Sequence, residues 1–363
     1  IAFNPTHARQ SQLMLSTALL LLVHGASAFH GSCLRARWMG SHPCGLVMVT
    51  YAEYLASRNG GVATNAEPTA TRIDAVATQT TGQTNVPGDT DVYAWLDWAP
   101  PKGSPTYDTL HRCFPGAIPG SVVRDRSVHV VSKFGLTPEN TIYGQSICPD
   151  EINNEKGDLS SLMIDHWGEV FPMGGIGGVP FVGKTGFGAF SAHVPSDGHL
   201  MILFGPHIAI SSTGELGKYL REGQSGESTA CGAVLAAYNA CCADQSCGSF
   251  LGKSYRYMFD EDDMQQSYLM ERVGQRVDFI KGAREPLDAL IHEAYSVVEE
   301  QMLKILNFNF GTGKVVLIGG VQINMPSPYQ DHFQPLYFKA LSRDNPSGID
   351  LLDTFRYNAL PPA

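Results

Sequence analysis

Residues 199–207, HLMILFGPH, decide the fold, because they combine a short apolar run with a histidine at its end. A run of this length, closed by Gly205 and a proline, is typical of a strand buried on both faces. A second such strand at residues 141–147 leads into Cys-Pro-Asp at 148–150. Because ligands of α/β sheets bind outside the carboxyl ends of the strands, these two ends are expected to meet in one site.

Further along the chain, the pattern alternates between strands and helices. Residues 315–319 predict a third short strand, and helical periodicity is strongest over residues 264–280 and 286–306. Residues 107–114 predict a helix, and residues 121–134 a helical or extended segment. The helices are expected to cover the sheet, which makes the fold class α/β.

Composition excludes several classes of protein. The chain has 363 residues, 43% of them hydrophobic, and a net charge of −10, with 35 acidic and 25 basic residues. Such a chain can bury a substantial core, and its acidic balance argues against nucleic acid as a partner. Eight cysteines are too few for a disulfide scaffold in a chain of this length.

The first residues are typical of a targeting segment. An apolar run at residues 13–23 follows Arg9 and precedes Ala-Ser-Ala at 26–28, which predicts a signal peptide over residues 1–28. Phe29 and the acid-free stretch after it resemble the plastid transit segment of diatoms and other algae with complex plastids, over residues 29–60. An ordinary secretory signal is the alternative. Because the chain begins at Ile1, we expect its natural amino terminus to lie upstream.

The rest of the chain divides into a linker, a domain and a tail. Residues 61–91 are rich in Thr, Ala, Gly and Asn and predict a linker. The folded domain is expected over residues 92–342, followed by a carboxyl-terminal tail over 343–363.

Cys148, His207 and Cys231 have the residue types of a zinc site. Three protein ligands with an open fourth position are typical of catalytic zinc, and the 84 residues that they span exclude a short zinc-finger loop. Each could instead be structural, since buried cysteines are common and a histidine can end a strand. Cys231 opens an alanine-rich helix, where the helix dipole favours the thiolate that a metal needs.

Residues 178–185 contain a literal Walker A string that ends in Gly-Lys-Thr and includes Lys184. A phosphate loop needs a strand before it and a helix after it, and the surrounding glycines and prolines predict a long loop instead. We therefore interpret the match as chance. A nucleotide hydrolase would also need a magnesium-holding aspartate, which the sequence does not identify.

Several longer motifs resemble the limiting-CO2-inducible B proteins of algae, which include the theta-type carbonic anhydrases. The resemblance covers residues 92–342 and lies in SICPDEIN (146–153), FVGKTGFGAFSAHVPSDG (181–198), LFGPHIAI (203–210), GESTACGAV (226–234) and VVLIGGVQINM (315–325). It implies a beta-carbonic-anhydrase-like, mostly parallel sheet flanked by helices, with Zn²⁺ held at the strand carboxyl ends by Cys148, His207 and Cys231.

The resemblance also implies that Asp150 is catalytic and paired with an arginine. In the beta type that arginine lies two residues beyond the aspartate, where this chain has Ile152. Arg112 is the predicted partner, and Arg221 is the second choice. Some family members are catalytically silent, so resemblance alone does not establish activity.

The implied function is the zinc-dependent, reversible hydration of CO2 to bicarbonate in an algal CO2-concentrating mechanism. The alternative is a non-catalytic partner protein of that machinery, in which zinc serves folding only. By resemblance the protein is expected to be a homodimer. It should lack a transmembrane segment after processing and reside in the stroma or the thylakoid lumen of the plastid.

Overall fold

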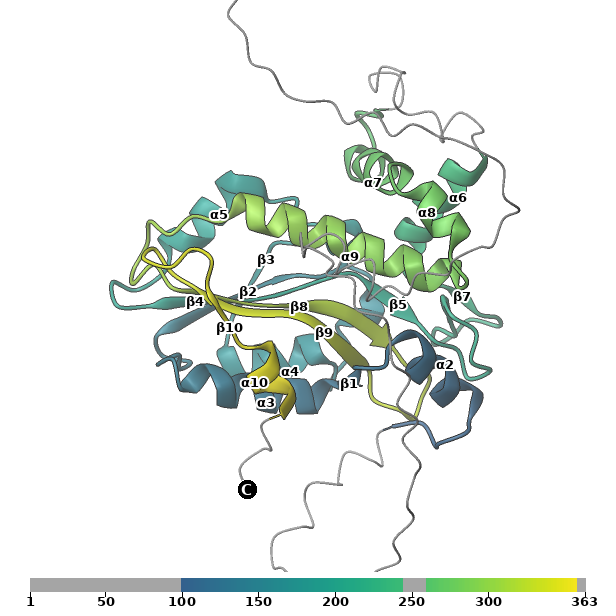
Figure 1. Ribbon diagram of the computed structural model, residues 1–363, viewed down its shortest axis with the longest axis horizontal. Coiled ribbons are helices and arrows are strands. Elements are labelled where there is room, and N and C mark those ends of the chain that lie inside the picture. The colour runs from purple at the N-terminus through teal and green to yellow at the C-terminus, as the bar shows by residue number, and fades with distance from the viewer. Residues whose placement is uncertain (1–98, 244–258, 358–363) are drawn as a thin grey trace, which may run out of the picture. The chain divides into compact units, whose positions relative to one another are not determined.

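Strand β4 (His199–Phe204) lies in the middle of the sheet, because all six of its residues are buried and strands pair with it on both sides. The computed structural model describes residues 99–243 and 259–357 (Figure 1). Strands β2 (Thr141–Ser146) and β8 (Val315–Asn324) flank β4, both parallel to it. The carboxyl ends of these three strands therefore meet at one edge.

The remaining strands extend the sheet outward from this parallel centre. Among the described residues the main sheet runs in the order β1-β9-β8-β4-β2-β3, with β10 paired to β9 and β5 to β8. Pairing is parallel for β3 and β5 and antiparallel for β9, β1 and β10. The bounds are β1 (Ile118–Pro119), β3 (Val170–Pro172), β5 (His207–Ala209), β9 (His332–Leu341) and β10 (Ile349–Asp350).

Helices cover both faces of the sheet (Figure 1). Alternate residues of β8 face opposite layers: Val315 and Leu317 belong to the apolar cluster with α9, whereas Val316 and Ile318 pack with α3, α4 and α10. On the first face lie α5 (Gly183–Ala192), α6 (Gly232–Ala243), α7 (Met264–Gly274), α8 (Val277–Gly282) and α9 (Pro286–Ile305). On the second lie α3 (Gly120–Ser132), α4 (Leu159–Trp167) and α10 (Leu352–Tyr357).

Helix α2 (Pro105–Cys113) begins at a sequence-encoded cap. The Ser104 side chain accepts a hydrogen bond from the backbone N–H of Tyr107 at 3.2 Å, and Pro105 follows it at the first helical position. Serine caps and a first-turn proline both favour helix initiation. The predicted helix at residues 107–114 is therefore confirmed.

The α/β class, the mostly parallel sheet and the three predicted strands are confirmed. Residues 121–134 are helical in α3, and the predicted helix at 264–280 is divided into α7 and α8. The expectation of a loop after the Walker-like string was wrong, because α5 begins at Gly183 within that string. Phe187 and Phe190 are fully buried, and this burial stabilises a helix despite its glycines.

Part of the predicted carboxyl-terminal tail, residues 343–363, packs against the sheet. Residues 349–350 form β10 against β9, and Leu351 and Phe355 are buried beneath the sheet. The ring of Phe355 lies edge-on to Phe338, with the centroids 5.6 Å apart. The domain therefore continues to at least residue 357.

The predicted signal peptide (1–28), transit segment (29–60) and linker (61–91) lie outside the described residues. Among the residues that are described, no helix combines the length and apolarity needed to cross a bilayer.

Folding stability should depend on His332 in β9. This side chain is 3% exposed, and burial lowers its pKa from 6.5 to about 4, although Nδ1 lies 2.8 Å from the carbonyl of Gln330. The unfolded state binds the proton more readily, so the stability contributed by neutral His332 is complete above pH 6.5 and is lost as the pH falls towards 4. At pH 5 the loss should be about 2 kcal/mol.

Denaturant unfolding of the wild type and of His332→Gln between pH 7 and pH 5 tests this prediction. The wild type should lose about 2 kcal/mol more than the variant across that range. Equal pH slopes for the two proteins would show that His332 does not titrate with this shift.

Candidate metal centre

His207 reaches the site through a sharp turn between β4 and β5. Gly205 adopts φ 151°, and a Cβ on it would lie 1.8 Å from the carbonyl oxygen of Gly320 in β8. Only glycine lets the chain pass β8 this closely and resume pairing at His207, which is in register with Gln322. The imidazole is consequently 1% exposed.

Cys148 lies on the turn that leaves β2, the neighbouring strand. A glycine loop packs against this turn: a Cβ on Gly174 would lie 2.3 Å from the carbonyl oxygen of Ile147, and one on Gly178 would lie 2.2 Å from that of Gly205. The Ser146 hydroxyl donates to the Gly178 carbonyl at 2.8 Å. The loop therefore fixes the ends of β2 and β4 relative to each other.

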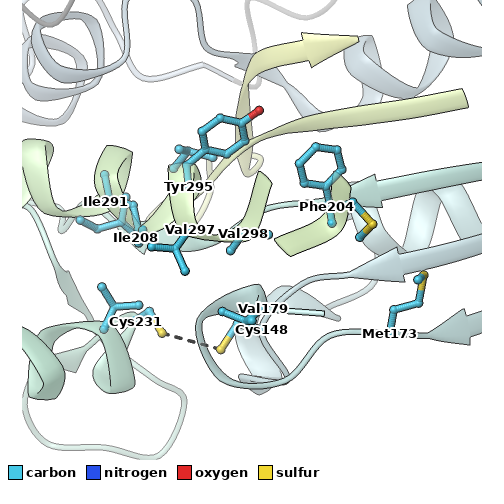
Figure 2. Packing of buried hydrophobic residues seen from close by; sticks show 14 of the residues in the cluster. Cys148, Met173, Val179, Phe204, Ile208, Cys231, Ile291, Tyr295, Val297 and Val298 are labelled. Carbon is cyan, nitrogen blue, oxygen red and sulfur yellow. Dashed lines mark hydrogen bonds between the residues drawn. The ribbon is translucent and has the colours of Figure 1, made fainter. Parts of the chain in front are cut away.

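Cys231 comes from a third direction, immediately before α6. Its Sγ lies 3.7 Å from Sγ of Cys148, and both thiols are buried (Figure 2). The hydrogen bond from Cys148 lowers the pKa of Cys231, and the backbone N–H groups of Ala233 and Val234 act in the same direction against burial. The hydrogen bond to Cys231 and then burial raise the pKa of Cys148. The pair therefore favours one thiolate, at the helix start where the sequence predicts it.

The three side chains fit a metal ion. Their ligand atoms all lie within 4.8 Å of one another. His207 Nε2 is buried and has no hydrogen-bond partner, and such a ring nitrogen is costly to bury unless something binds it. Two thiolates on a tetrahedral zinc, each at about 2.3 Å, would have their sulfurs about 3.8 Å apart. The observed 3.7 Å between the two Sγ atoms matches this separation.

Asp150 lies beside this donor set, and Arg221 holds it. Nη2 of Arg221 lies 2.9 Å from both Oδ1 and Oδ2 of the carboxylate, and Oδ2 lies 3.7 Å from His207 Nε2. Arg221 is itself fixed, since Nε donates to Glu151 at 2.6 Å and Nη1 to the hydroxyl of Ser228.

The prediction that Arg112 pairs with Asp150 was wrong, and the second choice, Arg221, is the partner. Arg112 lies in the last turn of helix α2, where its side chain is 49% exposed and lies 3.5 Å from Glu285. Arg221 instead follows β6 (Lys218–Tyr219), which pairs with β7 (Ser228–Thr229) in a short hairpin. This hairpin aims the guanidinium at the Cys148 turn.

Sequence reasoning missed Asn324, the last residue of β8. Its Oδ1 lies 2.8 Å from His207 Nδ1, on the side of the ring away from the thiols. Asn324 lies two residues beyond Gln322, the register partner of His207, so strand pairing brings its side chain to the ring. The only signal in the sequence was a polar residue at the end of an apolar strand.

Residues 117–342, more than half of the chain, match the family described as limiting CO2-inducible proteins B/C, beta carbonic anhydrases. The chain belongs to this family. Its carbonic-anhydrase-like domain brings together the three metal-ligand candidates named from the sequence.

Solved structures of the family have the same fold. PtLCIB4, a homolog of the limiting CO2-inducible protein LCIB, is 25% identical with a TM-score of 0.59, covering 68% of this chain and 99% of its own. A histidine-to-alanine mutant of PtLCIB4 is 26% identical with a TM-score of 0.58, covering 66% and 95%. LCIB itself is 24% identical with a TM-score of 0.50 over 66% of this chain and 95% of its own, which supports the fold alone. No curated protein matches the chain.

Metal analysis of the purified protein tests the donor set. We expect close to one metal ion per chain, and loss of it in Cys148→Ser and in His207→Ala, because each removes one of only three protein ligands. Cys113→Ser is the matched control, since this buried thiol lies outside the cluster. Full metal retention in either ligand variant would show that the set is wrong.

Proposed function

We propose that this protein is a zinc-dependent carbonic anhydrase that hydrates CO2 reversibly to bicarbonate. The observation that carries the proposal is the position of the Asp150 carboxylate. Nη2 of Arg221 contacts both of its oxygens, and Oδ2 lies 3.7 Å from the unpartnered Nε2 of His207. A carboxylate is thus placed beside a buried set of two thiols and one imidazole. This combination suits acid–base chemistry on a small molecule at an open metal position.

Two thiols and one imidazole favour zinc over harder ions such as magnesium or calcium. The chemistry that such an ion would supply is a nucleophilic oxygen near neutral pH, from acidified water. Cys148, His207 and Cys231 would hold the ion. They provide only three ligands, so a fourth position remains for a reactant.

Asp150 is proposed to accept a hydrogen bond from the nucleophile and so aim its lone pair at CO2. This role requires the carboxylate to stay away from the metal. Arg221 supports this requirement, because its Nη2 lies 2.9 Å from both carboxylate oxygens and restrains them. Without Arg221, Asp150 could occupy the fourth position itself and close the site.

The surroundings of the donor set suit a small neutral substrate. Cys148 and Cys231 belong to the same buried apolar cluster as Val179, Ile208 and Val234 (Figure 2). An apolar lining of this kind suits CO2, a neutral molecule that has little solvation to lose.

Hydration rates of Asp150→Ala and Arg221→Ala test the mechanism. Both variants should keep the metal yet lose activity by roughly 10²-fold or more, because each removes positioning of the reactant. The double variant should be little worse than either, as expected for residues that act as one unit.

The hydration rate of the wild type should rise from pH 7 to pH 9. Two thiolates donate more charge to zinc than two imidazoles would, so water on the ion would be less acidic than in a site of three histidines.

Arg112→Ala is the control for the Asp150 and Arg221 variants, because Arg112 pairs with Glu285 and should leave the rate unchanged. If the wild-type protein carries a full complement of zinc and does not hydrate CO2 at pH 9, the proposal that it is an enzyme is wrong. This result would favour a non-catalytic, zinc-containing partner protein of the CO2-concentrating machinery instead.

We further propose that the protein acts in the plastid of a diatom-like alga, in a CO2-concentrating mechanism and as a homodimer. The Ala28/Phe29 junction with the acid-free residues after it supports the plastid location. Membership of the limiting CO2-inducible family supports the CO2-concentrating role, and the homodimer is inferred from the resemblance to that family. Residues 1–60 fused to a fluorescent reporter should enter the plastid and be removed. Replacement of Phe29 with Ala should divert the reporter to an earlier membrane compartment, and unchanged plastid import would count against the motif.

A further inference from the structure

The ring of His207 is held from behind by a buried amide. Nδ1 lies 2.8 Å from Oδ1 of Asn324, and the two side chains are 1% and 0% exposed. The opposite ring nitrogen, Nε2, faces the thiols and Asp150. Because water does not reach this contact, the amide determines whether Nδ1 carries the proton in the neutral imidazole.

The orientation of the Asn324 amide is fixed by its other contacts. Nδ2 lies 2.7 Å from Oδ2 of Asp331, 3.1 Å from Oδ1 of Asn153 and 3.2 Å from the carbonyl oxygen of Ile152. An oxygen at the Nδ2 position would face these three acceptors without a proton between them. The oxygen of Asn324 must therefore point at His207, and since it can only accept, Nδ1 must donate.

Asp331 is the fixed end of this network. It is 7% exposed, and its Oδ1 accepts a hydrogen bond of 2.7 Å from the backbone N–H of Met325. The carboxyl group is thus tied to the residue after Asn324 as well as to its amide. Rotation of the Asn324 side chain would break the contact with Asp331 and leave a buried acceptor unpaired.

The same network reaches a second metal-ligand candidate through Asn153. Its Nδ2 donates to the carbonyl oxygen of Cys148 at 3.1 Å, while its Oδ1 accepts from Asn324. Asn153 is 0% exposed. One chain of amides therefore connects the Cys148 turn with the His207 ring, and both amides have the orientation that their neighbours require.

We propose that Asn324 is a positioning residue that keeps the proton of neutral His207 on Nδ1 and directs the Nε2 lone pair at the metal. Asn153 and Asp331 lock the orientation of its amide. The inference rests on the metal site of the proposed function. A neutral amide, rather than a carboxylate, touches the ring. Loss of such an outer contact lowers metal affinity by about 10- to 100-fold.

The test uses full-length protein labelled with ¹⁵N in the histidine rings, with His207→Ala to identify the His207 signals. In the metal-free wild type, at a pH high enough for the ring to be neutral, we expect the His207 proton on Nδ1. In Asn324→Leu, which keeps the volume but offers no acceptor, both ring nitrogens should be partly protonated. Zinc affinity, measured by competition with a chelator, should fall about 10- to 100-fold.

Gln145→Leu is the matched control. This buried amide in β2 accepts from Ser160 and Tyr143 on the same side of the sheet, and it lies outside the network around Asn324. The control should show the wild-type His207 spectrum and wild-type zinc affinity. Equal losses of zinc affinity in Asn324→Leu and Gln145→Leu would contradict the inference, because the effect would then not be specific to Asn324.

Two further results would overturn the inference, and neither overlaps with failure of the proposed function. One is a metal-free wild type with the proton on Nε2, and the other is wild-type zinc affinity in Asn324→Leu. Should Asn324→Leu fail to fold, Asn324→Ala decides by the same two measurements, since it also removes the acceptor for Nδ1 and adds no bulk. If the wild type does not bind zinc, the proposed function is wrong, but the position of the His207 proton can still be measured in the metal-free protein.

Discussion

Parallel pairing of β4 with β2 on one side and with β8 on the other is the constraint on which the site depends. Ser146 pairs with Phe204, and Phe204 with Gly319, so β2 and β4 end at the same level, while β8 continues to Asn324 and pairs with β5. Cys148 and His207 lie just beyond those ends. Close backbone contacts at Gly178, Gly205 and Gly320 maintain this alignment, because a single Cβ at any of these positions would collide with a neighbouring strand or carbonyl.

Charge balance explains why these particular groups can be buried together. Two thiolates and a divalent ion have no net charge, and the carboxylate of Asp150 is matched by the guanidinium of Arg221. Without the ion, the thiols respond to each other: the pKa of Cys148 is raised and that of Cys231 is lowered. A bound cation would allow both to ionise and would give His207 Nε2 the partner that it lacks.

The ligand candidates were predictable from the sequence because each follows or precedes a strongly apolar element. Strand β4 is a continuous buried run, and its end identifies His207 without any knowledge of pairing. Arg221 was harder to place, since its direction depends on a hairpin of two short strands with weak patterning. Asn324 could not be assigned a role, because its contact with His207 arises only from the register between β5 and β8. Helix α5 could not be predicted either, because its glycines disfavour a helix and the burial of its phenylalanines, which stabilises it, depends on the fold.

The central claim is that Cys148, His207 and Cys231 hold a metal in an open site. X-ray absorption at the zinc edge of the loaded protein measures this directly. The account predicts two sulfur ligands at about 2.3 Å and one imidazole nitrogen at about 2.0 Å, with a single oxygen or nitrogen atom in the fourth position. A zinc coordinated by nitrogen and oxygen only, or by three or four sulfurs, would contradict it.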